Sequence, residues 1–231
     1  MAAINQVITQ GIGTPAGIAE FILLGLQPDA GITFVDSSNN NDTSVGSITL
    51  TIPTGTAEDD LMIAIVGRGS NDVQRDWDDD GGGGNGWTRI VSNYTSAGRD
   101  EETAIFYKIA TASESNPTFT HGGAETLSGI IATYRNVHTT TPFDVVYSNG
   151  DHYTAHENDS TPTNDPITTN NDNSLVIVAG HTNFGDITAA GAPSGYTLRD
   201  SVVATNANVY LADKVVTSAG TETPGAWTHS S

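Results

Sequence analysis

The sequence predicts an all-β protein, more specifically a jelly-roll-like β-sandwich built from two similar halves. Short runs of β-branched and aromatic residues alternate with loops rich in Gly, Asn, Asp, Ser and Thr, and no segment of any length shows helical periodicity. One pattern of strands also occurs twice: residues 60–67, 86–90, 103–109 and 118–121 return as 174–180, 195–199, 208–215 and 226–229. Because two units of this length can close one core between them, the pattern indicates a duplicated half-domain rather than a repeat array.

Residues 1–31 are predicted to form an extended, apolar N-terminal anchor segment ahead of a duplicated sandwich over 32–231, with halves at about 32–148 and 149–231. The segment holds an almost wholly apolar run at 18–26, which must be buried against the sandwich or against another protein. Its apolar side chains are the candidate partner-docking residues: Val7, Ile8, Ile12, Ile18, Phe21, Ile22, Leu23, Leu24 and Leu26.

Two further patterns locate strands within the repeated unit. The continuous apolar run at 61–66 predicts a strand that is covered on both faces or lies centrally in the sandwich. Trp87 and Tyr196 occupy matching positions, each directly after a glycine at the start of a strand. We expect both to be aromatic plugs, with the preceding glycine allowing the chain to bend.

The second copy of the repeat lacks its last strand. In the first copy, His121 leads into an apolar strand at 127–134, whereas only two residues follow His229. Either the natural chain is longer, which is the explanation preferred from the sequence, or a segment from elsewhere fills the gap. The apolar N-terminal stretch is the candidate filler, in this subunit or in a neighbour by strand exchange.

Charge and composition limit the classes of partner. Eight Lys and Arg against 27 Asp and Glu give a net charge of −19, which repels phosphate backbones and anionic lipid, so neither nucleic acid nor membrane is an expected partner. The chain has no cysteine, which leaves no disulfide framework and no thiolate metal site. The N-terminal apolar run is short and broken by Glu20, so it predicts neither a signal peptide nor a membrane span.

An acidic stretch at 76–80 is the clearest chemical motif. Asp76, Asp78 and Asp80, followed by Gly81, match the opening of a calcium loop, in which alternate carboxylates converge on the cation. The acid expected six residues beyond the glycine is replaced by Trp87, so the motif is not an EF-hand. We favour a solvated acidic loop, with a calcium site completed by another loop as the alternative; calcium is the one candidate cofactor.

Histidines provide weaker signals. His152 and His156 have the composition of a metal site, but residues four apart on a strand lie roughly 13 Å apart, which favours a polar surface hairpin. His121 and His229 occupy matching repeat positions, which indicates a structural role at a strand end. His138 and His181 have no evident partner in the sequence.

The chain is not predicted to be an enzyme. It contains no Gly-x-Ser-x-Gly nucleophile motif, no His-Glu-x-x-His zinc motif and no phosphate-binding glycine loop. Aromatic residues in loops could instead stack on sugar rings, and Trp77 is the best candidate for glycan binding because charge and glycine flank it.

Several short motifs together resemble structural proteins of tailed-bacteriophage virions. Residues 7–15 and 21–26 resemble an N-terminal segment that precedes diverse domains in such proteins. The body resembles a β-sandwich class of phage particle proteins through four segments in order: 59–61, 86–88, 134–137 and 140–144. The resemblance covers nearly the whole chain. It departs from the class in the acidic, glycine-rich insertion at 76–85 and in the missing last strand.

The resemblance implies a non-enzymatic protein on the outer surface of the virion, of the capsid decoration, cement or head-fibre type. Its N-terminal segment would dock to the major capsid protein or to other virion proteins. The symmetry of the particle implies a homo-oligomer, with a trimer preferred. The alternative is a receptor- or carbohydrate-binding module of a tail fibre, which would bind a host surface glycan through Trp77 and the acidic loop.

Overall fold

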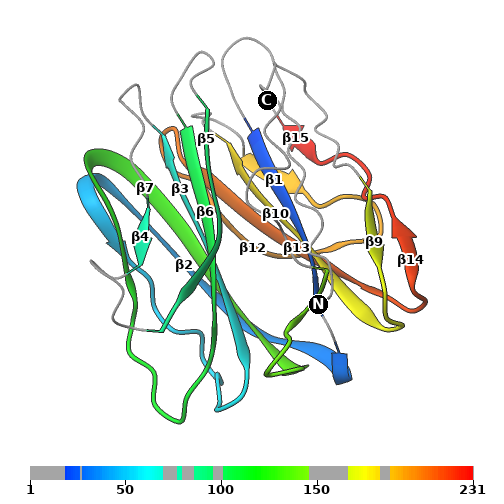
Figure 1. Ribbon diagram of the computed structural model, residues 1–231. Coiled ribbons are helices and arrows are strands. Elements are labelled where there is room, and N and C mark those ends of the chain that lie inside the picture. The colour runs from blue at the N-terminus through cyan, green and yellow to red at the C-terminus, as the bar shows by residue number, and fades with distance from the viewer. Residues whose placement is uncertain are drawn as a thin grey trace.

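The computed structural model describes residues 19–26, 28–69, 77–79, 86–95, 101–145, 166–182 and 188–230, and over these ranges the chain is all-β (Figure 1). Two large antiparallel sheets pack against each other, the six-stranded one on the left of Figure 1 and the five-stranded one to its right. This arrangement confirms the predicted β-sandwich.

The six-stranded sheet holds the first copy of the repeat, in the order β2-β7-β3-β6-β5, with β4 pairing with β7 beside this path. Its strands are β2 (Pro28–Thr49), β3 (Leu61–Gly69), β4 (Asp78–Asp79), β5 (Thr88–Thr95), β6 (Glu101–Ile109) and β7 (Thr118–Val137).

The five-stranded sheet holds the second copy, in the order β12-β13-β10-β1-β8. Its strands are β1 (Ala19–Leu26), β8 (Phe143–Val145), β10 (Ser174–Thr182), β12 (Thr197–Val202) and β13 (Asn208–Val216). Two small ladders accompany it, β9 (Ile167–Thr169) with β14 (Gly220–Glu222), and β11 (Thr188–Gly191) with β15 (Thr228–Ser230).

The central strand of each copy is buried on both faces. Every residue of β3 and of β10 is buried, and successive side chains enter different cores because strand residues alternate between faces. In β3, Leu61, Ile63 and Ile65 pack between the two sheets, whereas Met62 and its alternate neighbours pack in an outer core. The prediction that the run at 61–66 is covered on both faces is therefore confirmed.

Each outer core is closed by an aromatic plug at the predicted place. Trp87 is buried in the outer core of the first copy, and Tyr196 is buried in that of the second. The preceding Gly86 and Gly195 have φ of +75° and +85°, a left-handed conformation that favours glycine. Both plugs therefore use the bend that the glycines were expected to provide.

Strand β1 supplies the strand that the second copy lacks. Leu26 of β1 pairs with Leu175 of β10, as Tyr134 of β7 pairs with Leu61 of β3, and Leu61 and Leu175 are matching repeat positions. β1 thus occupies, in its own sheet, the place that the C-terminal half of β7 holds in the other. In this structure the N-terminal stretch of the same chain fills the gap, which is the second of the two explanations that the sequence analysis left open.

Two chain segments cross from one sheet to the other side by side, β1 with β2 and β7 with β8. Pro28 of β2 pairs with Val137 of β7 in the six-stranded sheet, and Gly25 of β1 pairs with Val145 of β8 in the five-stranded sheet. β1 and the start of β2 take part in these ladders, and position 31 lies within β2. The division into an anchor segment at 1–31 and a sandwich at 32–231 stays a prediction.

Polar contacts join the two sheets along the edge strand β12. The Arg199 guanidinium lies 4.6 Å from the ring centre of Phe34 on β2, and its Nε donates to Asp213 over 2.8 Å. Asn39 on β2 donates to the Asp200 carboxylate over 2.8 Å. Burial, reinforced by the nearby Asp213 carboxylate, raises the pKa of the Tyr134 hydroxyl well above its ordinary value.

We predict that a circular permutant will keep the fold. It begins at Pro28, continues to Ser230 and carries residues 19–26 after a flexible linker of about eight residues. In the first copy, the matching positions Gly122 and Leu127 are separated by residues 123–126, so this path is short. We expect an unchanged β circular-dichroism spectrum and cooperative thermal unfolding. The same permutant without residues 19–26 is the control, and cooperative unfolding of that control would contradict the role assigned to β1.

Candidate functional site

One end of the sandwich carries the segments that the sequence analysis selected. β3 ends at Gly69, which pairs with Glu101 at the start of β6, and β10 ends at Thr182, which pairs with Ala19 at the start of β1. Gly69 also lies against Asn206 in the turn between β12 and β13, so the two sheets meet at this end. The positions next to residues 1–18, called the leader below, and next to the segment that follows Gly69 and contains the acidic insertion therefore lie at the same end of the sandwich.

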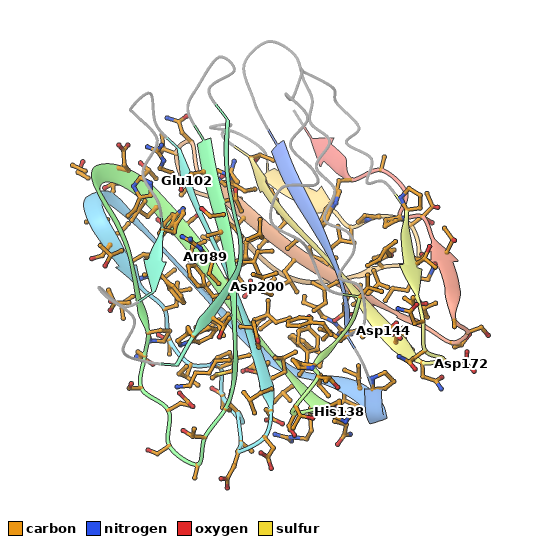
Figure 2. All side chains as sticks on the ribbon, in the orientation of Figure 1. Arg89, Glu102, His138, Asp144, Asp172 and Asp200 are labelled. Atoms are coloured by element: carbon orange, nitrogen blue, oxygen red, sulfur yellow. The ribbon has the colours of Figure 1, made fainter. Side chains whose placement is uncertain are left out.

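A buried cluster of charged side chains lies in the first copy near this end. Arg68 on β3 is 3.7 Å from the Glu102 carboxylate on β6 and 3.6 Å from the Glu125 carboxylate on β7. His121 on β7 makes a 3.0 Å hydrogen bond with Glu102 through Nε2, and the Ser92 hydroxyl donates to Glu102 over 3.1 Å. Glu102 is labelled in Figure 2, toward the upper end of the six-stranded sheet.

Strand register brings this cluster together. Arg68 and Glu102 are directly opposite each other across the β3–β6 pair. Arg68 lies on the same face of β3 as Val66 and Ala64, which pack in the outer core. Arg68, Glu102, Glu125 and His121 are all buried, so the group closes the polar end of the outer core. Charges removed from water in this way require mutual pairing, and access for a substrate is lacking at these side chains.

Trp77 covers the cluster and is not the exposed loop residue that the sequence analysis expected, while its role in glycan binding stays untested. Its side chain is only 1% exposed and packs edge-on against the His121 ring, with ring centres 5.0 Å apart. Arg89 donates to the Trp77 carbonyl over 2.8 Å. The acidic neighbours suggested a solvated loop, but the indole enters the outer core just before β4 because burying its large apolar surface outweighs the local charge pattern.

The second copy has a neutral pair at the matching positions. Thr182 and Asn208 are opposite each other across β10 and β13, and the Asn208 amide donates to the Thr182 hydroxyl over 3.2 Å. The charged cluster is thus specific to the first copy. Sequence reasoning missed it because its members come from three strands that only the sheet register aligns; the matched position of His121 was the one signal present.

His181 lies between the two sheets, packed directly on Gly67 of β3. A Cβ atom at Gly67 would lie 2.4 Å from the imidazole, so only glycine leaves room for the ring. Burial is the main cause that lowers the pKa of His181 to about 3, and the nearby Arg68 guanidinium is the second; the ring is therefore neutral near pH 7. Within the described part of the chain neither ring nitrogen has a hydrogen-bond partner. Sequence reasoning found no partner for His181 and did not predict this buried setting.

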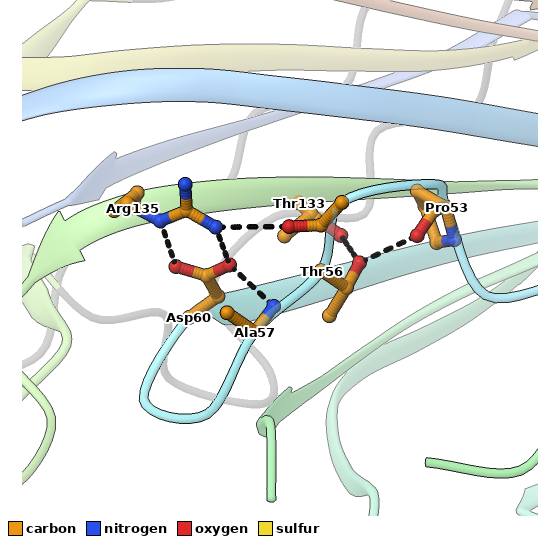
Figure 3. Close-up of polar contacts among 7 residues, drawn as sticks. Pro53, Thr56, Ala57, Asp60, Thr133 and Arg135 are labelled. Carbon is orange, nitrogen blue, oxygen red and sulfur yellow. Dashed lines mark hydrogen bonds and ion pairs between the residues drawn. The ribbon is translucent and has the colours of Figure 1, made fainter. Parts of the chain in front are cut away.

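Two motifs of the resemblance meet in one ion pair, drawn in Figure 3. Arg135 donates to both carboxylate oxygens of Asp60, over 2.8 and 2.6 Å, and to the Gly55 carbonyl over 2.9 Å. Asp60 also accepts from the Ala57 amide over 2.8 Å, and the neighbouring Asp59 has a left-handed φ of +70°. The pair fastens the turn before β3 to the end of β7, which explains these residues structurally.

The motif at 140–144 also has a structural role. The buried Asp144 carboxylate accepts hydrogen bonds from the Asn170 amide over 2.7 Å and from the Ser174 hydroxyl over 3.1 Å, which fixes the turn into β10 (Figure 2). His138 accepts from the Thr141 amide over 3.1 Å at its Nδ1, so it caps the link between β7 and β8.

The remaining predicted site residues are only partly within the described ranges. Val7, Ile8, Ile12 and Ile18 lie outside them, whereas Phe21, Ile22, Leu23 and Leu24 pair through their backbone with β10, and Leu26 is fully buried in the core between the sheets. Leu26 is therefore packed within this chain, and docking of these residues to a partner stays a prediction.

The calcium prediction stays untested. Asp76 and Asp80 lie outside the described ranges, as do His152 and His156, and Asp78 is placed only by its backbone pairing with Thr120. Among the described residues, no group of three or more His, Asp or Glu side chains is arranged to hold a metal ion.

Comparisons with protein families, curated proteins and solved structures find no match to this chain. In the described part of the chain, no helix is long and apolar enough to cross a membrane.

We predict that Arg68→Met will destabilise the protein by about 3–5 kcal/mol, because it leaves the buried Glu102 and Glu125 without their cation. The measurement is the free energy of unfolding from urea titrations. Lys214→Met is the matched control, since its pair with Glu222 is partly exposed and should cost about 1 kcal/mol or less. A loss below about 1 kcal/mol for Arg68→Met would show that the cluster is not stabilising.

His181 should make the fold sensitive to acid. Its folded pKa of about 3 lies below the ordinary value of 6.5, so the unfolded state takes up a proton first and stability falls as the pH drops below 6.5. Between pH 7.5 and 4.5 this residue should remove about 2–3 kcal/mol from the free energy of unfolding. The stability difference between the wild type and His181→Gln should shrink by that amount; a difference that stays constant with pH would contradict the burial of a neutral imidazole.

Proposed function

We propose that this chain is a non-enzymatic surface protein of a bacteriophage virion, of the capsid decoration, cement or head-fibre type. The observation that carries the proposal is that the motifs resembling phage particle proteins hold strands together: Asp60 with Arg135, Trp87 as a plug, and Asp144 at the turn into β10. The residues of these motifs thus have structural roles in this sandwich, which supports the proposal. Fold alone does not define a function, so the role on the particle remains our proposal.

The buried charges support a structural role rather than catalysis. Arg68, Glu102, Glu125 and His121 are paired with one another and covered by Trp77. A catalytic group must reach its substrate, and these side chains do not reach the surface. The carbohydrate-binding alternative loses its best residue for the same reason, because Trp77 is buried.

The leader is the proposed attachment to the particle. Because β1 belongs to the sandwich, the docking residues reduce to those ahead of it, Val7, Ile8, Ile12 and Ile18, with the major capsid protein or another virion protein as the partner. Apolar side chains in an extended segment can be buried against a partner while the backbone pairs with a sheet edge. Repeated copies on a symmetric particle are expected, with a homotrimer preferred.

Deleting residues 1–18 should abolish incorporation into particles while leaving the sandwich folded, since the deletion stops ahead of β1. The measurement is the amount of protein on purified particles, with antibody labelling in electron microscopy to locate it on the head or on the tail. The matched control replaces residues 1–18 by a Gly/Ser segment of equal length. Undiminished incorporation of the deleted protein would refute anchoring by the leader, and label confined to the tail would refute the capsid location.

A further inference from the structure

β1 is joined to the rest of the described chain at one end only. It pairs with β10 over its whole length and with β8 at Gly25 and Leu26, and it is the inner strand between them. Only Gln27 connects it to β2, and the chain has no cysteine that could fix it by a disulfide. Among the described strands only β2 is joined directly to β1 by the chain, so β1 can leave its groove while β10 and β8 stay in place.

The connection from β1 to β2 is one residue long. Gln27 is the single residue between Leu26, in the five-stranded sheet, and Pro28, in the six-stranded sheet. Short hinges that must carry the chain between two packed elements favour exchange of the terminal element between copies.

The groove between β10 and β8 can bind residues 19–26 of any copy of this chain, because every copy has the same sequence. Its contacts with β1 are the backbone ladder to β10, the core around Leu26, and the packing of Gly25 near Val145. The same strand from a second copy would form the same ladder and bury the same apolar surface. The free energies of the closed and exchanged forms then differ mainly in the hinge and in the entropy of association.

We propose that copies of this chain exchange β1, so that residues 19–26 of one copy fill the groove between β10 and β8 of another. The reciprocal dimer is the smallest closed product, and every sandwich in it is complete. The inference rests on the strand topology and is independent of a role on a virion. Since each chain carries a net charge of −19, exchange should increase with protein concentration and with salt, which screens the repulsion.

Two single-cysteine variants can detect exchange directly. Gly25 and Val176 face each other in register across β1 and β10, and a Cβ at Gly25 would make only ordinary contacts, at 3.5 Å or more. Directly opposed residues are close enough for a disulfide. Chains carrying Gly25→Cys are mixed with chains carrying Val176→Cys, unfolded, refolded together in about 0.5 M salt and oxidised. We expect a disulfide-linked heterodimer on a non-reducing gel.

The control replaces the groove cysteine by an exposed one. Gly25→Cys is mixed with Val203→Cys, whose side chain is exposed and follows β12, a strand that β13 and β10 separate from β1, so this mixture reports cross-linking by collision alone. A chain with both Gly25→Cys and Val176→Cys shows, by closing an internal disulfide, that the pair is competent. The proposal is overturned if that chain closes while the mixed chains yield no more heterodimer than the Val203 control.

A hinge series tests the same proposal without cysteines. Inserting about four Gly/Ser residues after Gln27 gives the closed form slack, so the dimer fraction after concentrated refolding should fall at least threefold. The same insertion after Thr140, in the link between β7 and β8, is the matched control, because β8 continues into the chain and cannot leave alone. Light scattering measures the dimer fraction; a wild type that remains monomeric, or equal effects of both insertions, would overturn the proposal.

Discussion

The structure depends on the closure of the second sheet by β1. Without it, β10 and β8 would face each other across an open groove, and the core between the sheets would lose Leu26. The two connections between the sheets are equivalent. β1, an inner strand of the five-stranded sheet, leads to β2 at the edge of the six-stranded sheet. β7, an inner strand of the six-stranded sheet, leads to β8 at the edge of the five-stranded sheet. Folding of the second copy therefore requires the N-terminal residues, which gives the whole domain long-range contacts and couples its two halves.

The two halves share a framework and differ in how they treat buried polarity. Lys108 pairs with Glu114 over 2.7 Å in the first copy, as Lys214 pairs with Glu222 over 2.6 Å in the second. The strand positions opposite each other near the loop-bearing end carry Arg68 and Glu102 in one copy, but Thr182 and Asn208 in the other. Removing charges from water is expensive, so the charged version requires the complete set of partners, whereas the neutral version tolerates an incomplete one.

Local patterns predicted most of the fold, and long-range register decided what they missed. The run at 61–66 and the glycine before Trp87 are properties of neighbouring residues, and each had the predicted structure. The burial of Trp77 and the cluster around Arg68 depend on which strands lie side by side, which no short window records. β1 depended on a local and a long-range signal. Its apolar run predicted that it is buried, but only the strand missing from the second repeat indicated that it pairs with β10.

Three edge strands of the sandwich are protected against pairing with another sheet. Strands β5 and β12 are edge strands, and each has a register shift at the matching place, between Arg89 and Val91 and between Leu198 and Asp200. Such bulges twist an edge away from pairing with another sheet. The edge strand β2 is engaged by its own chain, since Asn40 donates to the Thr49 carbonyl over 3.0 Å. The strongly negative charge also keeps copies apart, so edge-to-edge pairing at β2, β5 and β12 is disfavoured.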